Sequence, residues 1–311
     1  MIKLKQIFDY IKDVSLWLFL SKAFRSVFYK SNSLFAWRIN AWNENNVATY
    51  LWREVNGTEE NFQHFLGSAN PGVQSGTVFI MWWQGEEHAP ALVKCCIESL
   101  RQHVNGHSLV VISERNIEEY LKMPQFVKDL VKSGAMSFTH LSDLIRLNLL
   151  ALYGGAWVDA TVFCAKPIPE DYFLYPFYSI RTGKKTKDPS HGRWTTFVMF
   201  ATRNNLIVGK ALDYHYRYWM KHKMIADYIM FDYLIDAVVR HDNGAAHMIE
   251  AIPVGHQDCF NLINRLDEND FDLANYIKNR DTVFYKLSWK RDFHDMERIV
   301  EMLNNVTGKD A

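Results

Sequence analysis

The sequence predicts an α/β fold in which helices cover a parallel sheet, and three observations indicate this. Residues 77–82 form a short β-branched, apolar and aromatic run that is typical of a buried strand, and residues 108–113 form another. Between them, residues 89–103 place apolar side chains at helical spacing. Strand, helix and strand within about 35 residues make a βαβ unit, which implies parallel strands covered by helices.

The rest of the chain agrees with this class. Residues 2 to about 55 have a helical pattern, and glycine and proline breaks at 70–76 separate them from the first strand. After the βαβ unit we expect helices at 117–133, 140–152, 205–221 and 227–240 and strands at 156–158, 176–180, 196–201 and 282–289. The sequence therefore predicts an N-terminal helical region, 1–75, and a main domain, 76–311.

Composition and charge limit the kinds of protein this can be. The chain has 311 residues, 48% of them hydrophobic, which is ample for a large core. Lysine plus arginine number 35, as do aspartate plus glutamate, so no net positive field favours nucleic acid as a partner. Cys95, Cys96, Cys164 and Cys259 fit neither a zinc motif nor a secreted disulfide framework. We expect these thiols to be reduced and buried, in a cytoplasmic protein.

Residues 14–29 have two possible interpretations. Aromatic and basic side chains alternate there, as in segments that lie in a membrane interface. Those side chains are Trp17, Phe19, Lys22, Phe24, Arg25 and Phe28, with Lys30 just beyond. A membrane contact would place the protein peripherally on the inner face of the cell membrane, whereas we favour the commoner case, a helix packed on its own domain. No run reaches the ~20 apolar residues that cross a bilayer.

One helix–turn–strand segment carries the most functional information. Asp143 and Arg146 are three positions apart on a predicted helix, so their side chains project from one face. A carboxylate beside a guanidinium suits sugar hydroxyls and phosphate oxygens. Gly154-Gly155 should end the helix and let backbone approach a ligand closely. Asp159 follows at the carboxyl end of the next strand, where open α/β sheets bind ligands.

The residues of this segment leave two interpretations open. Asp159 could supply an oxygen ligand to a divalent ion that bridges diphosphate oxygens. Alternatively, the segment is an ordinary amphipathic helix with an internal salt bridge, followed by a surface aspartate. The order of the whole segment favours the ligand site over the ordinary helix.

The chain resembles the bacterial capsular polysaccharide synthesis glycosyltransferases, relatives of DXD-containing sugar transferases such as initiating mannosyltransferases and clostridial toxin glucosyltransferases. The resemblance spans residues 77–290. Its matching segments are Trp82-Trp83-Gln84-Gly85, Glu119-Tyr120-Leu121, Leu141-Ser142-Asp143-Leu144-Ile145-Arg146, Tyr153-Gly154-Gly155, Trp157-Val158-Asp159-Ala160-Thr161 and Tyr285-Lys286-Leu287-Ser288-Trp289-Lys290.

This resemblance implies a glycosyltransferase A-type, Rossmann-like fold with a mixed sheet. It implies transfer of a hexose-type sugar from a nucleotide-diphosphate donor, most simply a UDP-sugar. The acceptor would be a saccharide or lipid-linked saccharide of a capsular or other cell-surface polysaccharide. Relatives usually use Mn²⁺ or Mg²⁺ and retain anomeric configuration, and their catalytic residues correspond to Asp143, Arg146 and Asp159 here. Thr161 replaces the second aspartate of the wider family, so we expect a weaker or water-mediated metal contact there.

Further residues are predicted to complete the donor and metal sites. One of the two indoles that end the first strand can stack on a base while the other packs in the core. The predicted donor-binding residues are Trp82, Trp83, Gln84, Gly85, Asp143, Arg146, Gly154, Gly155, Ser288, Trp289 and Lys290. His256 could complete the metal shell, although its spacing fits no zinc motif. The lysine-rich loop at 183–188 is either a surface turn or a lid.

Two other classes of function stay open. One is a nonenzymatic scaffold of a polysaccharide assembly complex with a degenerate transferase fold, which the threonine at 161 supports. The other is a metal-dependent phosphoester hydrolase, for which a single aspartate is weak evidence. Neither the dinucleotide-binding nor the P-loop glycine signature occurs in the sequence.

Overall fold

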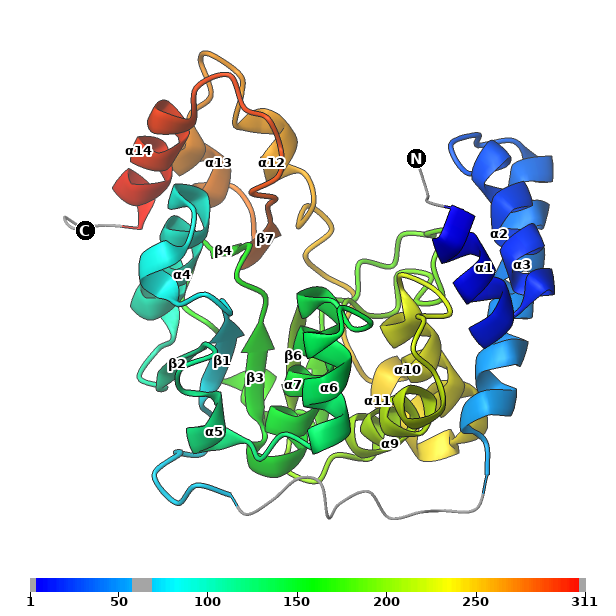
Figure 1. The fold of residues 1–311 in the computed structure, drawn as a ribbon. Helices are drawn as coiled ribbons and strands as arrows, with labels where there is room; N and C mark the ends of the chain where they lie inside the picture. Colours follow the sequence, from blue (N-terminus) through cyan, green and yellow to red (C-terminus); the bar gives the residue numbers. More distant parts are fainter. Residues whose placement is uncertain (1–3, 58–68, 308–311) are drawn as a thin grey trace.

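The computed structural model describes residues 4–57 and 69–307, and a five-stranded mixed sheet lies at its centre (Figure 1). The strand order is β2-β1-β3-β6-β5, and β4 pairs with β7 in a second, two-stranded sheet. The strands are β1 Val78–Met81, β2 Leu109–Ile112, β3 Gly155–Val158, β4 Val162–Cys164, β5 Phe177–Ser179, β6 Val198–Ala201 and β7 Phe284–Lys286.

Helices flank both sheets (Figure 1). They are α1 Leu4–Asp13, α2 Leu16–Phe28, α3 Leu34–Val55, the 3₁₀ turn η2 Glu86–His88, α4 Ala91–His103, α5 Ile117–Tyr120, α6 Gln125–Lys132, α7 Phe138–Tyr153, α8 Asp171–Leu174, α9 Leu206–Lys221, α10 Met230–His241, α11 Asn243–Glu250, α12 Leu262–Arg265, α13 Leu273–Lys278 and α14 Met296–Val306.

The sheet is mixed and flanked by helices, as the family resemblance implies, and this corrects the simpler all-parallel expectation. Strands β2, β1 and β3 are parallel, as the βαβ unit predicts. Strand β6 lies antiparallel to β3, and β5 lies antiparallel to β6. The predicted helix at 117–133 is broken into α5 and α6, because Pro124 precedes α6 and the residue before a proline disfavours helix. Strand β4 was not predicted, since three residues carry little periodicity.

The predicted N-terminal helices are present, and they belong to the main body of the fold. Helix α3 packs against α9 and α10, and its residues Val47, Leu51 and Val55 are part of the main hydrophobic core. Residues 58–68 of the predicted N-terminal region lie outside the described residues. Within the described chain, no helix is both long and apolar enough to cross a membrane. All four cysteines are free and buried, as predicted.

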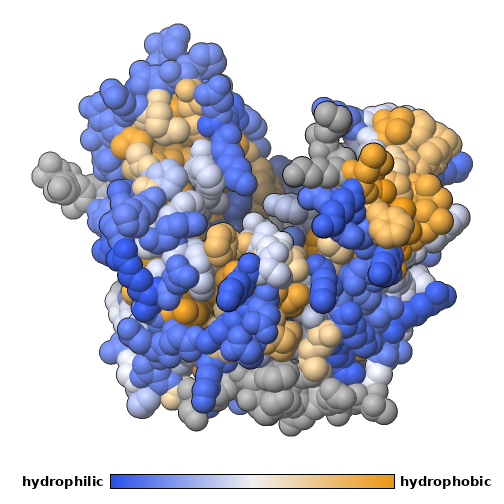
Figure 2. Space-filling model, in the orientation of Figure 1, coloured by the Kyte–Doolittle hydropathy of each residue, from blue (hydrophilic) through white to orange (hydrophobic). Residues whose placement is uncertain are grey.

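The fold leaves a hollow between two groups of helices. In Figure 1, α12, α13 and α14 rise with β4 and β7 on one side, and α1, α2 and α3 rise on the other. Figure 2 shows that the surface is hollowed between these groups. The turn at residues 159–161 joins β3 to β4, so the predicted catalytic aspartate lies where the sheet meets the first group.

Candidate active site

Three segments that are distant in the sequence bring four charged side chains together. Asp143 and Arg146 lie on α7, which begins after Ser137, whose hydroxyl accepts a hydrogen bond from the third residue of the helix. Asp159 follows β3, and Lys286 ends β7, where it pairs with the first residue of β4. Three of these groups thus lie on α7 and β7, and Asp159 lies in the short turn between β3 and β4.

Asp159 is the centre of this cluster. Its Oδ1 accepts from Nη2 of Arg146 at 3.0 Å and from Nε1 of Trp157 at 2.9 Å, while its Oδ2 accepts from Nζ of Lys286 at 2.7 Å. Its backbone N–H donates to the carbonyl oxygen of Phe197 at 2.8 Å. The carboxylate is therefore fixed in place by two cations and an indole.

Arg146 is the most deeply buried member, with 4% of its side chain exposed. Nη2 lies 3.5 Å from Oδ1 of Asp143, and Nη1 donates to the carbonyl oxygen of Thr196. Its guanidinium carbon lies 5.0 Å from the ring centres of Trp157 and Phe231. Its Nε is buried and has no acceptor among the described residues, so one strong donor is left without a protein partner.

The two carboxylates have opposite pKa shifts. Burial raises the pKa of Asp143 to about 7, against the attraction of Arg146 and with some repulsion from Asp159. Burial would also raise the pKa of Asp159, but Lys286 and Arg146 outweigh it and hold that pKa below its ordinary value. Near neutral pH, Asp159 is therefore the permanent anion, and Asp143 can accept or donate a hydrogen bond.

Trp82 and Trp83 follow the end of β1, are both partly buried, and contact different aromatic neighbours. Trp82 contacts Trp289 edge to face at 6.0 Å, whereas Trp83 stacks on Phe138 at 5.8 Å. The indole N–H of Trp82 is buried and has no acceptor among the described residues. Trp289 is 42% exposed, and Nζ of Lys290 lies 5.5 Å from its ring centre. Trp82 and Trp289 thus form an aromatic pair with an unused donor.

Other predicted donor-binding residues lie near these strand ends. Gln84 is exposed and Gly85 is buried, in a turn where the Gly85 N–H donates to the Trp82 carbonyl oxygen at 2.9 Å. Ser288 is half-buried and follows β7.

Gly154 and Gly155 are placed differently from our prediction. They lie at the start of β3, whereas Asp159 follows its end. A Cβ on Gly155 would stand 2.2 Å from the carbonyl oxygen of Thr77, and one on Gly154 would stand 2.7 Å from the backbone nitrogen of Arg203. These glycines allow β3 to pack closely on its neighbours, so their predicted contact with the donor does not fit.

His256 is committed to structural hydrogen bonds. Its Nδ1 accepts from the backbone N–H of Val283 at 3.2 Å, so Nε2 is left to donate to the hydroxyl of Tyr172 at 2.7 Å. With both nitrogens used, the predicted metal contact through this residue does not fit.

The site as a whole does not fit a divalent metal. Both oxygens of Asp159 already accept from cationic or N–H donors, and Thr161 adds a neutral hydroxyl at most. No group of three or more His, Cys, Asp or Glu residues that could hold a metal occurs among the described residues. We therefore derive no chemistry through a metal, and Mn²⁺ or Mg²⁺ stays a prediction of the sequence.

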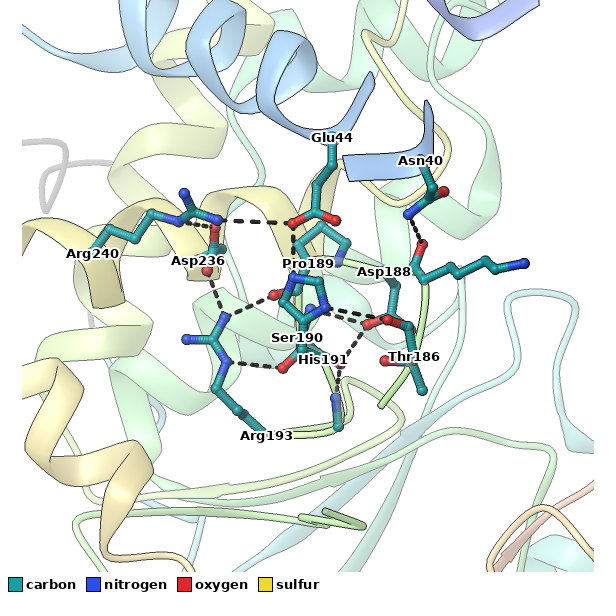
Figure 3. A network of polar contacts seen from close by, with 12 residues as sticks. Asn40, Glu44, Thr186, Asp188, Pro189, Ser190, His191, Arg193, Asp236 and Arg240 are labelled. Atoms are coloured by element: carbon teal, nitrogen blue, oxygen red, sulfur yellow. Dashed lines mark hydrogen bonds and ion pairs between the residues drawn. The ribbon is translucent and has the colours of Figure 1, made fainter. Parts of the chain in front are cut away.

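The segment 183–188, predicted to be either a surface turn or a lid, belongs to a longer loop at 182–193 that is fastened to the N-terminal helices (Figure 3). Nε2 of His191 lies 2.9 Å from Oε1 of Glu44 on α3, and the amide of Asn40 donates to the carbonyl oxygen of Lys187 at 3.2 Å. Nζ of Lys187 donates in turn to two carbonyl oxygens after α2. Figure 3 also shows Arg193 reaching Asp236 of α10, at 2.7 Å. The loop is an anchored connection that continues directly into the site.

Two functional candidates were missed by the sequence reasoning. Lys286 lies within the family-like segment 285–290 but was not predicted to be a site residue, although a single lysine in an apolar strand signals a carboxylate partner. Asp232 on α10 accepts from the indole N–H of Trp194 at 3.0 Å. Burial raises the pKa of Asp232 to about 7, helped by Asp188 and Asp143, and no local sequence pattern indicates this.

This chain is similar to several known proteins. A family model described as "Capsular polysaccharide synthesis protein" matches residues 6–306. An O-glycosyltransferase, braB of Annulohypoxylon truncatum, is 25% identical over an alignment of 122 residues that covers 36% of this chain and 29% of that protein. The chain thus spans less than a third of that relative. A solved structure titled PaToxG Glycosyltransferase is similar with a TM-score of 0.36 and 12% identity, over 68% of this chain and 83% of that one.

Proposed function

Because this chain belongs to the capsular polysaccharide synthesis protein family, we propose that it is a glycosyltransferase that extends a capsular or other cell-surface polysaccharide. In this proposal a nucleotide-diphosphate donor, most simply a UDP-sugar, supplies a hexose to a saccharide or lipid-linked saccharide. The observation that carries the proposal is the partly buried cluster of Asp143, Arg146, Asp159 and Lys286 at the end of β3. Two cations beside two carboxylates can bind phosphate and sugar hydroxyls at the same place.

Lys286 and Arg146 would bind the departing diphosphate. Both side chains donate hydrogen bonds to Asp159 and could donate them to phosphate oxygens instead. Nε of Arg146 has no acceptor among the described residues. Cations preorganised where negative charge develops stabilise the transition state, and their effect is large where water is excluded. Asp159 would hold both cations in position before the donor arrives.

Asp143 would bind the donor sugar. Its raised pKa lets the carboxyl accept hydrogen bonds from hydroxyls as an anion or donate one as a neutral acid. The unused indole N–H of Trp82 and the exposed ring of Trp289 would contact the nucleotide, since aromatic faces stack on any base.

The transfer needs no separate protein base if configuration is retained. The bond from the anomeric carbon to the diphosphate oxygen breaks, and the acceptor oxygen bonds to the same face of that carbon. The acceptor proton passes to the departing diphosphate, which accepts it as its charge grows. Arg146 and Lys286 would stabilise that charge until the diphosphate is protonated.

A donor panel tests the proposal. We expect one nucleotide sugar to raise the melting temperature of the full chain and to be slowly hydrolysed. Asp159→Ala should abolish both the rise in melting temperature and the hydrolysis. Asp270 is exposed, so Asp270→Ala should change neither. If no nucleotide sugar binds, the scaffold interpretation replaces ours. If Asp159→Ala keeps normal turnover, the assignment of this aspartate is wrong.

A further inference from the structure

Apolar side chains are concentrated on the outside of the three N-terminal helices. Of the eighteen large hydrophobic residues exposed in the described chain, eleven lie on these helices or their connections. They are Leu4, Phe8, Leu16, Trp17, Leu20, Phe24, Val27, Tyr29, Leu34, Phe35 and Trp42, which we call the N-terminal patch. Figure 2 shows apolar surface over α2 and α3. Soluble monomers rarely expose large contiguous apolar areas, so this patch indicates a binding surface.

Helix α2 turns its apolar face toward solvent. Trp17, Leu20, Phe24 and Val27 recur at spacings of three and four residues, which places them on one side of the helix. They are 58%, 50%, 48% and 74% exposed, in that order. A helix that only completes its own domain would bury this side.

The opposite face of α2 is held by polar contacts. The buried hydroxyl of Ser21 lies 3.0 Å from Oδ1 of Asn43 on α3 and donates to it. Nζ of Lys22 pairs with Asp227 at 3.2 Å. These contacts and the buried side chain of Leu18 attach α2 to the domain, and they leave the other apolar side of the helix free.

Aromatic rings make the patch continuous across α2 and α3. Trp42 contacts Trp17 at 5.8 Å and Phe24 at 6.3 Å, both edge to face. Phe28 contacts Phe24 and Phe35, each at 5.3 Å. The exposed apolar side chains are therefore joined in one surface and are not scattered singly.

The charge along α2 and the first part of α3 has one sign, whereas α1 carries Asp9 and Asp13 as well as Lys5 and Lys12. Residues 14–43 contain Lys22, Arg25, Lys30 and Arg38 and no aspartate or glutamate, although the whole chain has a net charge of +0. Lys30 and Arg38 are exposed, and no ion pair of either occurs in the described part of the chain. An apolar surface with uncompensated cations matches a partner that offers both apolar depth and negative charge.

We propose that the N-terminal patch docks onto the surface of a lipid bilayer with anionic head groups. Tryptophan and phenylalanine would enter the boundary between head groups and acyl chains, while Lys30 and Arg38 reach lipid phosphates. A second copy of the chain fits less well, because a two-fold contact through the patch would place the same cations against each other. The proposal does not depend on the transferase activity, since the patch uses none of the site residues.

Vesicle binding tests this proposal on the full chain without any donor. We expect the protein to sediment with vesicles that contain phosphatidylglycerol and to prefer them to pure phosphatidylcholine. Replacing Leu20, Phe24 and Val27 by glutamine should weaken this binding at least about tenfold. The matched control replaces Leu174 and Met220, which are 77% and 51% exposed but lie outside the patch, and it should bind normally.

A charge variant separates the two parts of the attraction. Lys30→Glu with Arg38→Glu should remove the preference for phosphatidylglycerol, and unchanged far-ultraviolet dichroism would show that the fold is intact. Failure of the unmodified protein to bind anionic vesicles overturns the proposal. Self-association that the glutamine variant abolishes would also overturn it, because a second copy would then cover the patch.

Discussion

Replacing the carboxyl of Asp143 by an amide should stabilise the protein at alkaline pH. In the folded chain burial raises the pKa of Asp143 from 3.8 to about 7, even with Arg146 3.5 Å away. In the unfolded chain the carboxyl has its ordinary pKa. Between these two pKa values the folded state therefore binds one more proton than the unfolded state, and the free energy of unfolding falls as pH rises.

The size of this effect follows from the shift. About three pKa units correspond to a ceiling of about 4 kcal/mol at 1.36 kcal/mol per unit. Asparagine cannot ionise, so the Asp143→Asn variant avoids this cost. We expect it to exceed the wild type in stability by about 1–4 kcal/mol at pH 8 and to differ little at pH 4, where the wild-type carboxyl is protonated.

Urea unfolding at pH 4 and pH 8 measures this difference, with Asp159→Asn as the control. The pKa of Asp159 is lowered, because Lys286 and Arg146 outweigh burial, so its ionised form contributes stability above pH 3.8. Its loss should destabilise the protein by about 1–3 kcal/mol at pH 8. An Asp143→Asn variant less stable than wild type at pH 8 would refute the reasoning, since the Arg146 pair would then outweigh burial.

Three further changes test other parts of the structure. Lys286→Met should weaken UDP binding in calorimetry and slow turnover about 100-fold, and unchanged binding would remove Lys286 from the diphosphate site. Mn²⁺ alone should leave the melting temperature of the wild type unchanged. It should raise the melting temperature of the Lys286→Asp variant, in which a second carboxylate lies beside Asp159. An equal rise in both proteins would show that the metal displaces the lysine. Gly155→Ala should lower the free energy of unfolding by about 2 kcal/mol or more, because its Cβ would meet Thr77. Gly106→Ala shares the positive φ but meets nothing within 4 Å, so urea unfolding should show a smaller loss; equal losses would contradict the packing argument.

The part of the site that lies in one stretch of sequence could be predicted from that stretch. Asp143 and Arg146 share a helix face because of helical periodicity, and the glycine break fixes where β3 begins. From there the strand length sets the position of Asp159. Each step is local, so the order of residue types was sufficient to group these three side chains.

The fourth member of the cluster depends on long-range pairing. Lys286 follows Asp159 by 127 positions and reaches it because β7 pairs with β4, placing Val162 opposite Lys286. No periodicity in either strand reveals that register. The sequence predicted a metal at Asp159 because it does not show that the ammonium group of Lys286 already lies against that carboxylate.

The connection between the N-terminal helices and the site also depends on tertiary contacts. The loop that His191 ties to Glu44 runs on to Thr196, whose carbonyl oxygen accepts from Arg146. The family match begins at residue 6 rather than at the first strand, which agrees with helices that belong to the functional unit. The sequence pattern alone predicted a separate N-terminal helical region, because the polar contacts that anchor these helices have no periodic signal.

The energetics of Asp143 favour a role in binding over a role in folding. Its carboxyl lies 3.5 Å from a guanidinium, yet burial still raises its pKa to about 7, so the ion pair does not repay the desolvation. Arg146 has a better partner in Asp159, at 3.0 Å, and does not need Asp143 to be neutralised. A carboxyl that weakens the fold at neutral pH agrees with our proposal that a ligand's hydroxyls supply the missing hydrogen bonds. A bound sugar would do so, and it would lower the pKa of Asp143 as it binds.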